Sequence, residues 1–288
     1  MNIQQYESCM DRDFGCPNPD PLKKTLVIYS NCHGSFIHRM FTTNSDIVKD
    51  YNIYLILCYV YKTGKDPQNF SHLLKLADIF LYQLVYKNDS KLSTFEENEN
   101  SILKRLKTPC QLVCFANPQN DAIFLAKHPD LSEYVKQNNI KTIMNANFSY
   151  LQQRIFEKTT RIFLEKDQTC DVKIFDFIIF NISKQRIFVD KYHPTSIVLL
   201  EITKRLIEFF PKKYSFDIHQ FPDNIMNFTE AGPNSSVDAT FYKMEFISPE
   251  ESNIGNVQLQ NRINDIWEQD QFKKEFDLVK DYAISVWE

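Results

Sequence analysis

The 288-residue sequence has little glycine, no long apolar run and no excess of basic residues. It contains five glycines, and no apolar stretch approaches the roughly 20 residues that a membrane-spanning helix needs. Residues 1–21 lack the apolar core of a signal peptide. The formal net charge is −4, whereas nucleic-acid-binding domains usually carry a basic face. These absences predict a soluble, cytoplasmic protein with no membrane span and no nucleic-acid partner; they do not indicate its oligomeric state.

The number and spacing of the cysteines predict neither a disulfide framework nor a metal site. There are seven, an odd number, and Cys58, Cys110 and Cys114 lie inside apolar runs, where a free cysteine behaves as a small hydrophobic residue. Cys110 and Cys114 would share one face of a strand, but no second Cys or His pair follows at zinc-site spacing. We therefore expect no metal.

The composition predicts a globular chain with three parts. Hydrophobic residues make up 43% and aromatic residues 14%, enough for a sizeable core. Residues 1–22 are polar and rich in proline, which favours a loosely packed leader. Residues 23–211 have the pattern of an α/β catalytic domain, and residues 212–288 are expected to form a mostly helical appendage.

Short apolar runs alternate with helical patterns in the first half of the chain. This order predicts a parallel sheet with right-handed crossovers. The predicted strands are Leu26–Tyr29, Asn52–Tyr61, Asp78–Val85 and Gln111–Phe115, and the predicted helices after the first one are Phe70–Leu76 and Glu96–Leu106.

The second half carries mainly helical patterns. An amphipathic helix is expected to begin at Pro194, a residue suited to the first helical position. Ala239–Phe246 alternates in the manner of a hairpin or edge strand, and Ser248 begins a capped helix that leads into the acidic helical stretch Ile263–Trp287.

The turn after the first strand holds the strongest candidate for a reactive residue. The sequence TLVIYSNCHGSFIHRMF changes from strand to helix at Asn31–Gly34, which places Cys32 beside the unpaired N–H groups of a helix start. These groups favour a thiolate and can stabilise an oxyanion.

Other turns would open at the same edge, because the carboxyl ends of parallel strands lie together. Asp190 and His193 would supply a carboxylate and a base of near-neutral pKa, so with Cys32 they form a possible nucleophile, base and orienting acid. Each also has a structural interpretation: a packed cysteine, a helix-capping histidine and a solvated carboxylate.

Asp190-x-x-His193-Pro194, together with an early nucleophile turn, resembles the SGNH/GDSL hydrolase plan. Asn31-Cys32-His33-Gly34 after the first strand, Asp78–Gln83 in the third strand and a terminal His193-Pro194-Thr195 are more similar to the WcbI-type capsular polysaccharide biosynthesis acetyltransferases. That family carries a Gly-Asn-Cys-Gln-Gly signature; here Ser30 stands in place of the first Gly and His33 in place of Gln.

The resemblance, over residues 24–210, implies an SGNH-like three-layer α/β/α fold and a function. It implies transfer of an acetyl group from acetyl-coenzyme A to a sugar hydroxyl, with coenzyme A and a sugar or glycan as binding partners. Cys32 would occupy the place of the SGNH serine, His193 would be the general base and Asp190 its partner. Either Cys32 would carry the acyl group, or His193 would activate the hydroxyl while Cys32 lines the site. The oxyanion- or substrate-binding candidates are Asn31, His33, Gly34, Gln83 and Asn117.

Two other functions stay open. A cysteine esterase or thioesterase of the same fold would deliver the acyl group to water, and a non-catalytic protein would use the site to bind a glycan or a partner protein.

Overall fold

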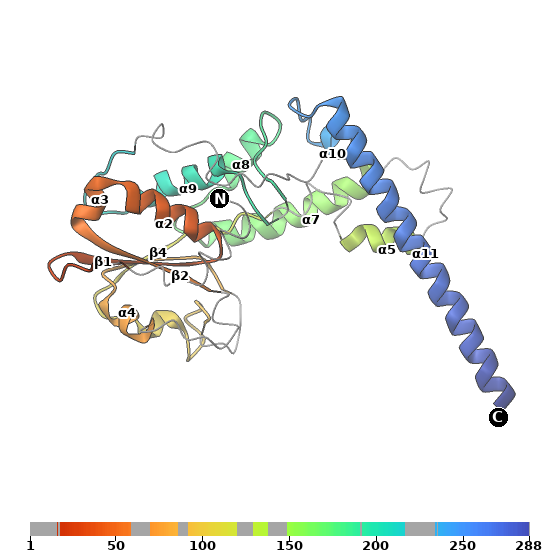
Figure 1. The fold of residues 1–288 in the computed structure, drawn as a ribbon, viewed down its shortest axis with the longest axis horizontal. Helices are drawn as coiled ribbons and strands as arrows, with labels where there is room; N and C mark the ends of the chain where they lie inside the picture. The colour runs from red at the N-terminus through yellow and green to blue at the C-terminus, as the bar shows by residue number, and fades with distance from the viewer. Residues whose placement is uncertain are drawn as a thin grey trace. The chain divides into compact units, whose positions relative to one another are not determined.

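In the computed structural model, the chain forms two compact units (Figure 1). The sheet unit comprises Met1–Pro118, Leu164–Ile178 and Pro194–Phe228, and the helical unit comprises Gln119–Phe163, Ile179–His193 and Thr229–Glu288. The structure describes residues 16, 18–58, 70–85, 92–119, 129–137, 149–190, 192–216, 234 and 236–287. The domain boundaries expected after residues 22 and 211 stay a prediction.

The sheet unit is built on a four-stranded parallel sheet. The strand order is β2-β1-β3-β4, so β1, β3 and β4 are consecutive neighbours. This arrangement confirms the predicted parallel α/β class. The strands are β1 Lys24–Ser30, β2 Tyr51–Leu57, β3 Ile79–Tyr82 and β4 Gln111–Cys114.

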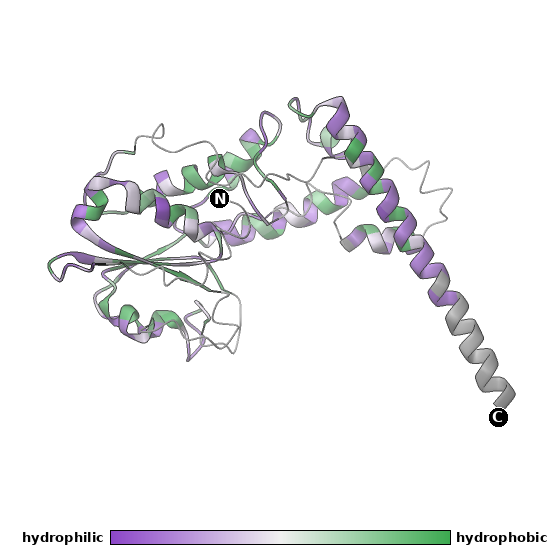
Figure 2. Cartoon of the chain, viewed as in Figure 1, coloured by the Kyte–Doolittle hydropathy of each residue, from purple (hydrophilic) through white to green (hydrophobic). Residues whose placement is uncertain are grey.

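The strands form because their residues are apolar on both faces, as in a sheet covered by helices on each side. Six of the seven residues of β1 are buried, and the sheet runs through the centre of this unit (Figure 2). Three strands are shorter than predicted: β3 ends at Tyr82 rather than Val85, β4 ends at Cys114 rather than Phe115, and β2 ends at Leu57, with residues 59–61 outside the described part.

Helices cover both faces of the sheet (Figure 1). On one face lie α2, α3 and α9, and α2 packs against both β2 and α9. On the other lie α4 and the 3₁₀ helix η2, where Phe70, Leu74 and Ile102 join Val27 and Phe80 in a buried cluster. The bounds are α2 His33–Thr43, α3 Ser45–Asp50, α4 Phe70–Leu76, η2 Ile102–Arg105 and α9 Ser196–Ile207.

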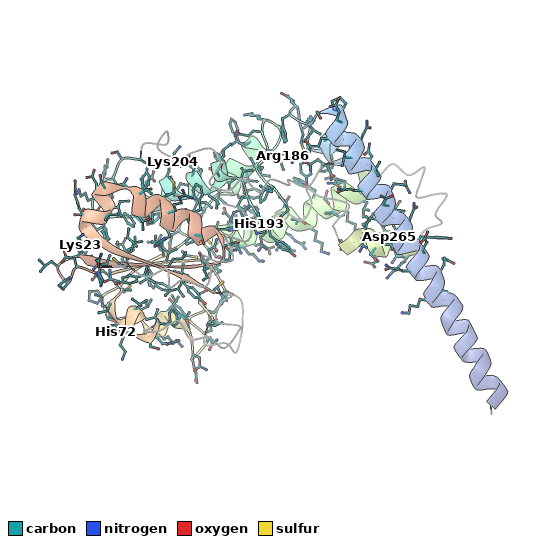
Figure 3. The ribbon with its side chains drawn as sticks, in the orientation of Figure 1. Lys23, His72, Arg186, His193, Lys204 and Asp265 are labelled. Carbon is teal, nitrogen blue, oxygen red and sulfur yellow. The ribbon has the colours of Figure 1, made fainter. Side chains whose placement is uncertain are left out.

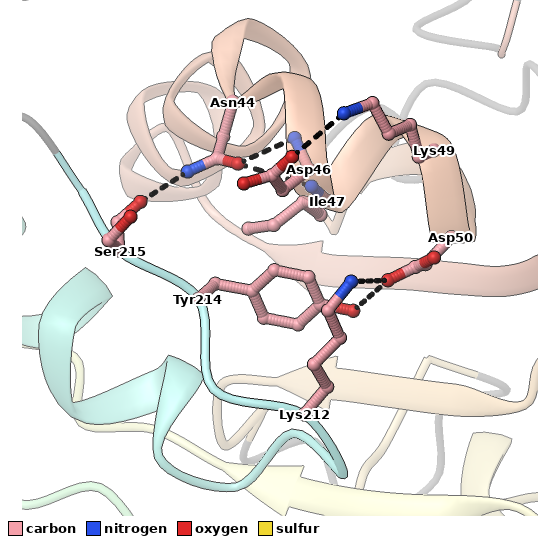
Figure 4. A network of polar contacts seen from close by, with 8 residues as sticks. All are labelled: Asn44, Asp46, Ile47, Lys49, Asp50, Lys212, Tyr214 and Ser215. Carbon is pink, nitrogen blue, oxygen red and sulfur yellow. Dashed lines mark hydrogen bonds and ion pairs between the residues drawn. The ribbon is translucent and has the colours of Figure 1, made fainter.

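A polar network attaches the segment after α9 to α3 (Figure 4). The Asp50 carboxylate accepts hydrogen bonds from the Tyr214 hydroxyl at 2.7 Å and from Lys212 at 3.0 Å. The side chain of Asn44, which caps α3, donates to the Ser215 carbonyl at 2.9 Å. Residues 212–215 therefore pack on the sheet unit.

The helical unit contains helices from three parts of the chain. Lys158 on α7 pairs with Asp130 on α5 at 3.2 Å, and Arg186, labelled in Figure 3, pairs with Glu251 on α11. The helices are α5 Pro129–Gln137, α10 Ser236–Phe241, α11 Pro249–Trp287 and the greater part of α7 Ser149–Gln168. A further helix, α8 Phe175–Asn181, begins in the sheet unit and ends in this one.

Two predicted elements are wrong. Glu96–Leu106 is not a helix but a series of turns that ends in η2, because Asn98 and Ser101 side chains accept backbone N–H groups two residues ahead and so compete with a helix. Ala239–Phe246 is not a strand: α10 ends at Phe241, and Lys243 adopts a left-handed φ of 53° just beyond it.

Within the described ranges, no helix is both long and apolar enough to cross a membrane.

Candidate functional site at the carboxyl edge of the sheet

Cys32 lies between the end of β1 and the start of α2. Strand β1 ends at Ser30 and α2 begins at His33, so the connection consists of Asn31 and Cys32 alone. Cys32 occupies the N-cap position of α2, and its side chain makes no capping hydrogen bond. The partly exposed thiol thus lies beside the first turn of a helix, as the sequence predicts.

Three amide side chains converge at this edge of the sheet. Because β1, β3 and β4 are neighbours, Asn31, Gln83 and Asn117 follow strands that end side by side. Gln83 Oε1 accepts the Asn31 N–H at 3.1 Å, and Asn31 Nδ2 donates to Asn117 Oδ1 at 3.0 Å. We call these three residues the amide cluster.

The orientation of each amide follows from backbone groups of known polarity. The Oε1 of Gln83 must face the Asn31 N–H, and its Nε2 donates to the Ala116 carbonyl at 3.2 Å. The Oδ1 of Asn31 accepts the His33 N–H at 2.9 Å, so its Nδ2 faces Asn117. Asn117 therefore turns its own Nδ2 away from Asn31, and no acceptor within the described residues pairs with that group.

His33 adds a third contact to Gln83. Its ring is fully buried, and Nδ1 lies 3.4 Å from Gln83 Nε2. Since that nitrogen of Gln83 can only donate, Nδ1 accepts and the ring proton belongs on Nε2. Both amide hydrogens of Gln83 then have partners inside the protein, which suits a residue that holds the turn in place.

Gly34 is required by close packing with Ser30. A Cβ at position 34 would lie 1.8 Å from Ser30 Oγ and 2.9 Å from Leu55 Cδ1. The fully buried Ser30 hydroxyl donates to the Asn31 carbonyl at 2.8 Å. The hydroxyl of Ser30 thus uses space that glycine leaves open.

Asp190 and His193 form a hydrogen-bonded pair in the helical unit, where Figure 3 labels His193. His193 Nδ1 lies 2.8 Å from Asp190 Oδ2, while Asp190 Oδ1 accepts the backbone N–H groups of Tyr192 and His193. Partial burial works against the charge of Asp190, but hydrogen bonds from His193 and Tyr192 outweigh it and lower the pKa of this carboxyl group. The contact favours a proton on Nδ1, which makes Nε2 the basic nitrogen of His193.

The helix after His193 begins later than predicted. Thr195 is the N-cap and α9 starts at Ser196, so Pro194 is not its first residue. The predicted apolar stripe is present at Leu199 and Leu206, both fully buried.

Two further thiols lie in the sheet unit. Cys114 Sγ at the end of β4 is 3.5 Å from Cys170 Sγ, and both residues are buried. The neighbouring thiol and burial raise the pKa of Cys114. In the part of the chain that the structure describes, no group of three or more His, Cys, Asp or Glu side chains could hold a metal ion.

Two contributors to the turn were not identified from the sequence. The Ala116 carbonyl orients Gln83, and the Ser30 hydroxyl packs against Gly34. A backbone carbonyl leaves no mark in a sequence. The Ser30 contact had a weak signal in the sequence. Ser30 stands where the Gly-Asn-Cys-Gln-Gly signature has its first glycine, four residues before Gly34.

These features define an α/β protein whose parallel sheet presents a cysteine and an amide cluster at its carboxyl edge. No known family model and no curated protein matches the chain. Among solved structures it is similar to WcbI, described as a novel polysaccharide biosynthesis enzyme, in its native form without a disulfide bond between coenzyme A and a cysteine. The TM-score is 0.57 at 13% sequence identity, and the alignment covers 85% of this chain and 94% of WcbI. The likeness shows a shared fold.

Proposed function

We propose that this chain is an enzyme of polysaccharide biosynthesis that transfers an acetyl group from acetyl-coenzyme A to a sugar hydroxyl. The observation that carries the proposal is Cys32 at the start of α2 beside the amide cluster, on a fold shared with WcbI. The description of WcbI names coenzyme A together with a cysteine, and states that the native protein has no disulfide bond between them. We also propose the SGNH-like arrangement, in which Cys32 takes the place of the serine.

The residues present suit a thioester substrate. A thiol at a helix N-terminus can act as a nucleophile, and amide N–H groups can hold a carbonyl oxygen as it gains charge. Asn117 Nδ2 is our candidate for this donor, since Asn117 Oδ1 is committed to Asn31. Gln83 serves to position Asn31, because both its hydrogens are used internally.

Acetyl-coenzyme A supplies the acyl group, and coenzyme A leaves as a free thiol. In the covalent route, His193 accepts the proton of Cys32, whose sulfur bonds to the acyl carbon, and this proton passes to the leaving sulfur. His193 then accepts the proton of the sugar hydroxyl as its oxygen bonds to the acyl carbon, and Cys32 regains a proton as its bond to that carbon breaks. In the direct route, His193 activates the hydroxyl and no acyl group resides on Cys32. Asp190 holds the imidazole in either case.

Binding and turnover test the proposal together. Calorimetry with coenzyme A should detect binding, and the purified chain should transfer labelled acetyl from acetyl-coenzyme A to a nucleotide sugar or glycan. His193→Ala should lower kcat by at least about 100-fold in either route, and Cys32→Ala should do so in the covalent route. Cys110→Ala is the matched control, because Cys110 immediately precedes β4 and so lies at the amino edge of the sheet.

The outcomes separate the alternatives. Mass spectrometry should find one acetyl group on Cys32 in the covalent route and none in the direct route. Release of acetate to water without transfer would identify an esterase or thioesterase. Neither binding nor turnover across nucleotide sugars and glycans would refute the proposal.

A further inference from the structure

The helix α11 carries two apolar faces in different halves of its length. In the first half, Leu259, Ile263 and Ile266 follow one another at helical spacing and are 5%, 2% and 3% exposed. In this unit α11 packs against α5 and α10. The first face is therefore accounted for by the core of the helical unit.

The same line of the helix becomes charged after Ile266. Asp270 and Lys274 continue it at helical spacing and form an ion pair at 2.7 Å. Positions 277 and 281, both aspartate, extend the line further. The side that packs in the first half is thus a polar side in the second.

A second apolar line begins where the first ends. Phe272, Phe276, Val279, Ala283 and Val286 follow one another at alternating intervals of four and three residues. At about 100° per residue, these positions lie about 150° around the helix from the first face. The four-three spacing is that of a coiled-coil seam.

The two lines lie on nearly opposite sides of one helix. Helix α11 continues without a bend past the end of α5 (Figure 1), and a straight helix that packs one side against its own unit turns the opposite side outward. In the first half the outward side is indeed exposed, as at Asn261, Asp265 and Glu268. A partner for the second line would approach from the side opposite the first.

Charge complementarity indicates what that partner is. Beside the seam, Glu268 and Lys273 are five residues apart, and so are Glu275 and Lys280. This is the spacing at which positions flanking the seams of two identical parallel helices meet, and both pairs unite opposite charges. In an antiparallel pair, glutamate would face glutamate and lysine would face lysine.

We propose that residues 272–286 of α11 pair in parallel and in register with the same residues of a second copy of this chain. The seam spans little more than two heptads, so the dimer should be weak and dependent on concentration. This proposal does not rest on the function proposed above.

Sedimentation equilibrium of the full chain over a range of concentrations tests the pairing. Wild-type protein should show reversible monomer–dimer association. Glu275→Lys and Lys280→Glu each replace two attractive contacts by two repulsive ones in the dimer, so each should raise the dissociation constant about tenfold. The double variant Glu275→Lys/Lys280→Glu restores opposite charges and should return the constant to within about threefold of wild type.

Asp281→Lys is the matched control, because it makes the same change of charge on the polar line of the helix. It should leave the dissociation constant within about twofold of wild type. A wild-type chain that stays monomeric at every concentration would overturn the proposal. So would a dimer that Glu275→Lys weakens no more than Asp281→Lys, or one that the double variant fails to restore. Circular dichroism of each variant verifies that the fold is retained.

Discussion

Alanine at position 34 probes the packing of the turn that carries Cys32. Its Cβ would lie 1.8 Å from Ser30 Oγ, far inside the 3.4–4 Å of ordinary contact. Ser30 is fully buried and its hydroxyl donates to the Asn31 carbonyl, so the oxygen can move only by giving up that bond. The substitution therefore forces either the strand end or the helix start to shift.

The effect of Gly34→Ala on the free energy of unfolding combines destabilising and stabilising contributions. Overpacking a close contact costs about 1–3 kcal/mol, and loss of the Ser30 hydrogen bond adds about 0.5–1.5 kcal/mol. Alanine also favours a helix over glycine by up to about 1 kcal/mol, which offsets part of this. We expect Gly34→Ala to lower the free energy of unfolding by about 2 kcal/mol, as measured by urea denaturation.

A second substitution tests the cause. Ser30→Ala alone should cost about 1 kcal/mol through the lost hydrogen bond. Combined with Gly34→Ala, it removes the clashing oxygen and leaves two milder contacts, with the flexible end of Leu55 at 2.9 Å and with the Cβ of residue 30 at 3.1 Å. The double variant should therefore be more stable than Gly34→Ala alone. If the two losses simply add, the packing argument is refuted.

Three other measurements examine buried polar groups. Gln83 is 2% exposed, and Gln83→Met leaves its backbone partners unpaired, so it should lower the free energy of unfolding by about 2–5 kcal/mol. The control Gln111→Met removes an exposed amide bonded to one backbone carbonyl and should lower it by under about 1 kcal/mol. Equal losses in urea denaturation would contradict the role of Gln83 in positioning Asn31. Desolvation lowers the pKa of His38 from 6.5 to about 4 despite an opposing backbone hydrogen bond, so the folded state favours the neutral ring. The free energy of unfolding should therefore fall by up to about 3 kcal/mol as pH falls from 6.5 to 4. His38→Gln should flatten this dependence of the free energy of unfolding on pH, and an unchanged dependence would exclude His38 as its source. The thiol of Cys170 and burial raise the pKa of Cys114, and both cysteines are buried. Iodoacetamide should therefore modify Cys114 and Cys170 in urea but not in the native protein. Rapid labelling of the native protein would contradict the burial of the two thiols.

The sheet could be predicted because its strands are short apolar runs that need burial on both faces. The same signal failed at Ala239–Phe246, where Tyr242 and Met244 are buried in alternation but belong to a turn after α10. A short alternating run therefore does not distinguish a strand from a turn in which every second side chain faces the core.

The site could be predicted only as far as the ends of the strands. Parallel strands bring Asn31, Gln83 and Asn117 to one edge, and their residue types indicate hydrogen bonding. Their pairing depends on strand order and on the Ala116 carbonyl, which no spacing in the sequence reveals. Sequence reasoning could thus nominate Gln83 but not show that its amide is occupied internally.

The structure also explains how the turn accommodates residues that differ from the Gly-Asn-Cys-Gln-Gly signature. Ser30 fits because Gly34 leaves room for its hydroxyl, which donates a hydrogen bond to the Asn31 carbonyl. His33 fits because its Nδ1 accepts from Gln83, so a buried ring meets a donor rather than an unpaired group. Ser30 and His33 thus each contact a specific neighbour, Ser30 within the turn and His33 after β3, while Cys32 lies between strand and helix. These contacts predict that Ser30→Gly alone removes the hydrogen bond to the Asn31 carbonyl and lowers the free energy of unfolding in urea denaturation.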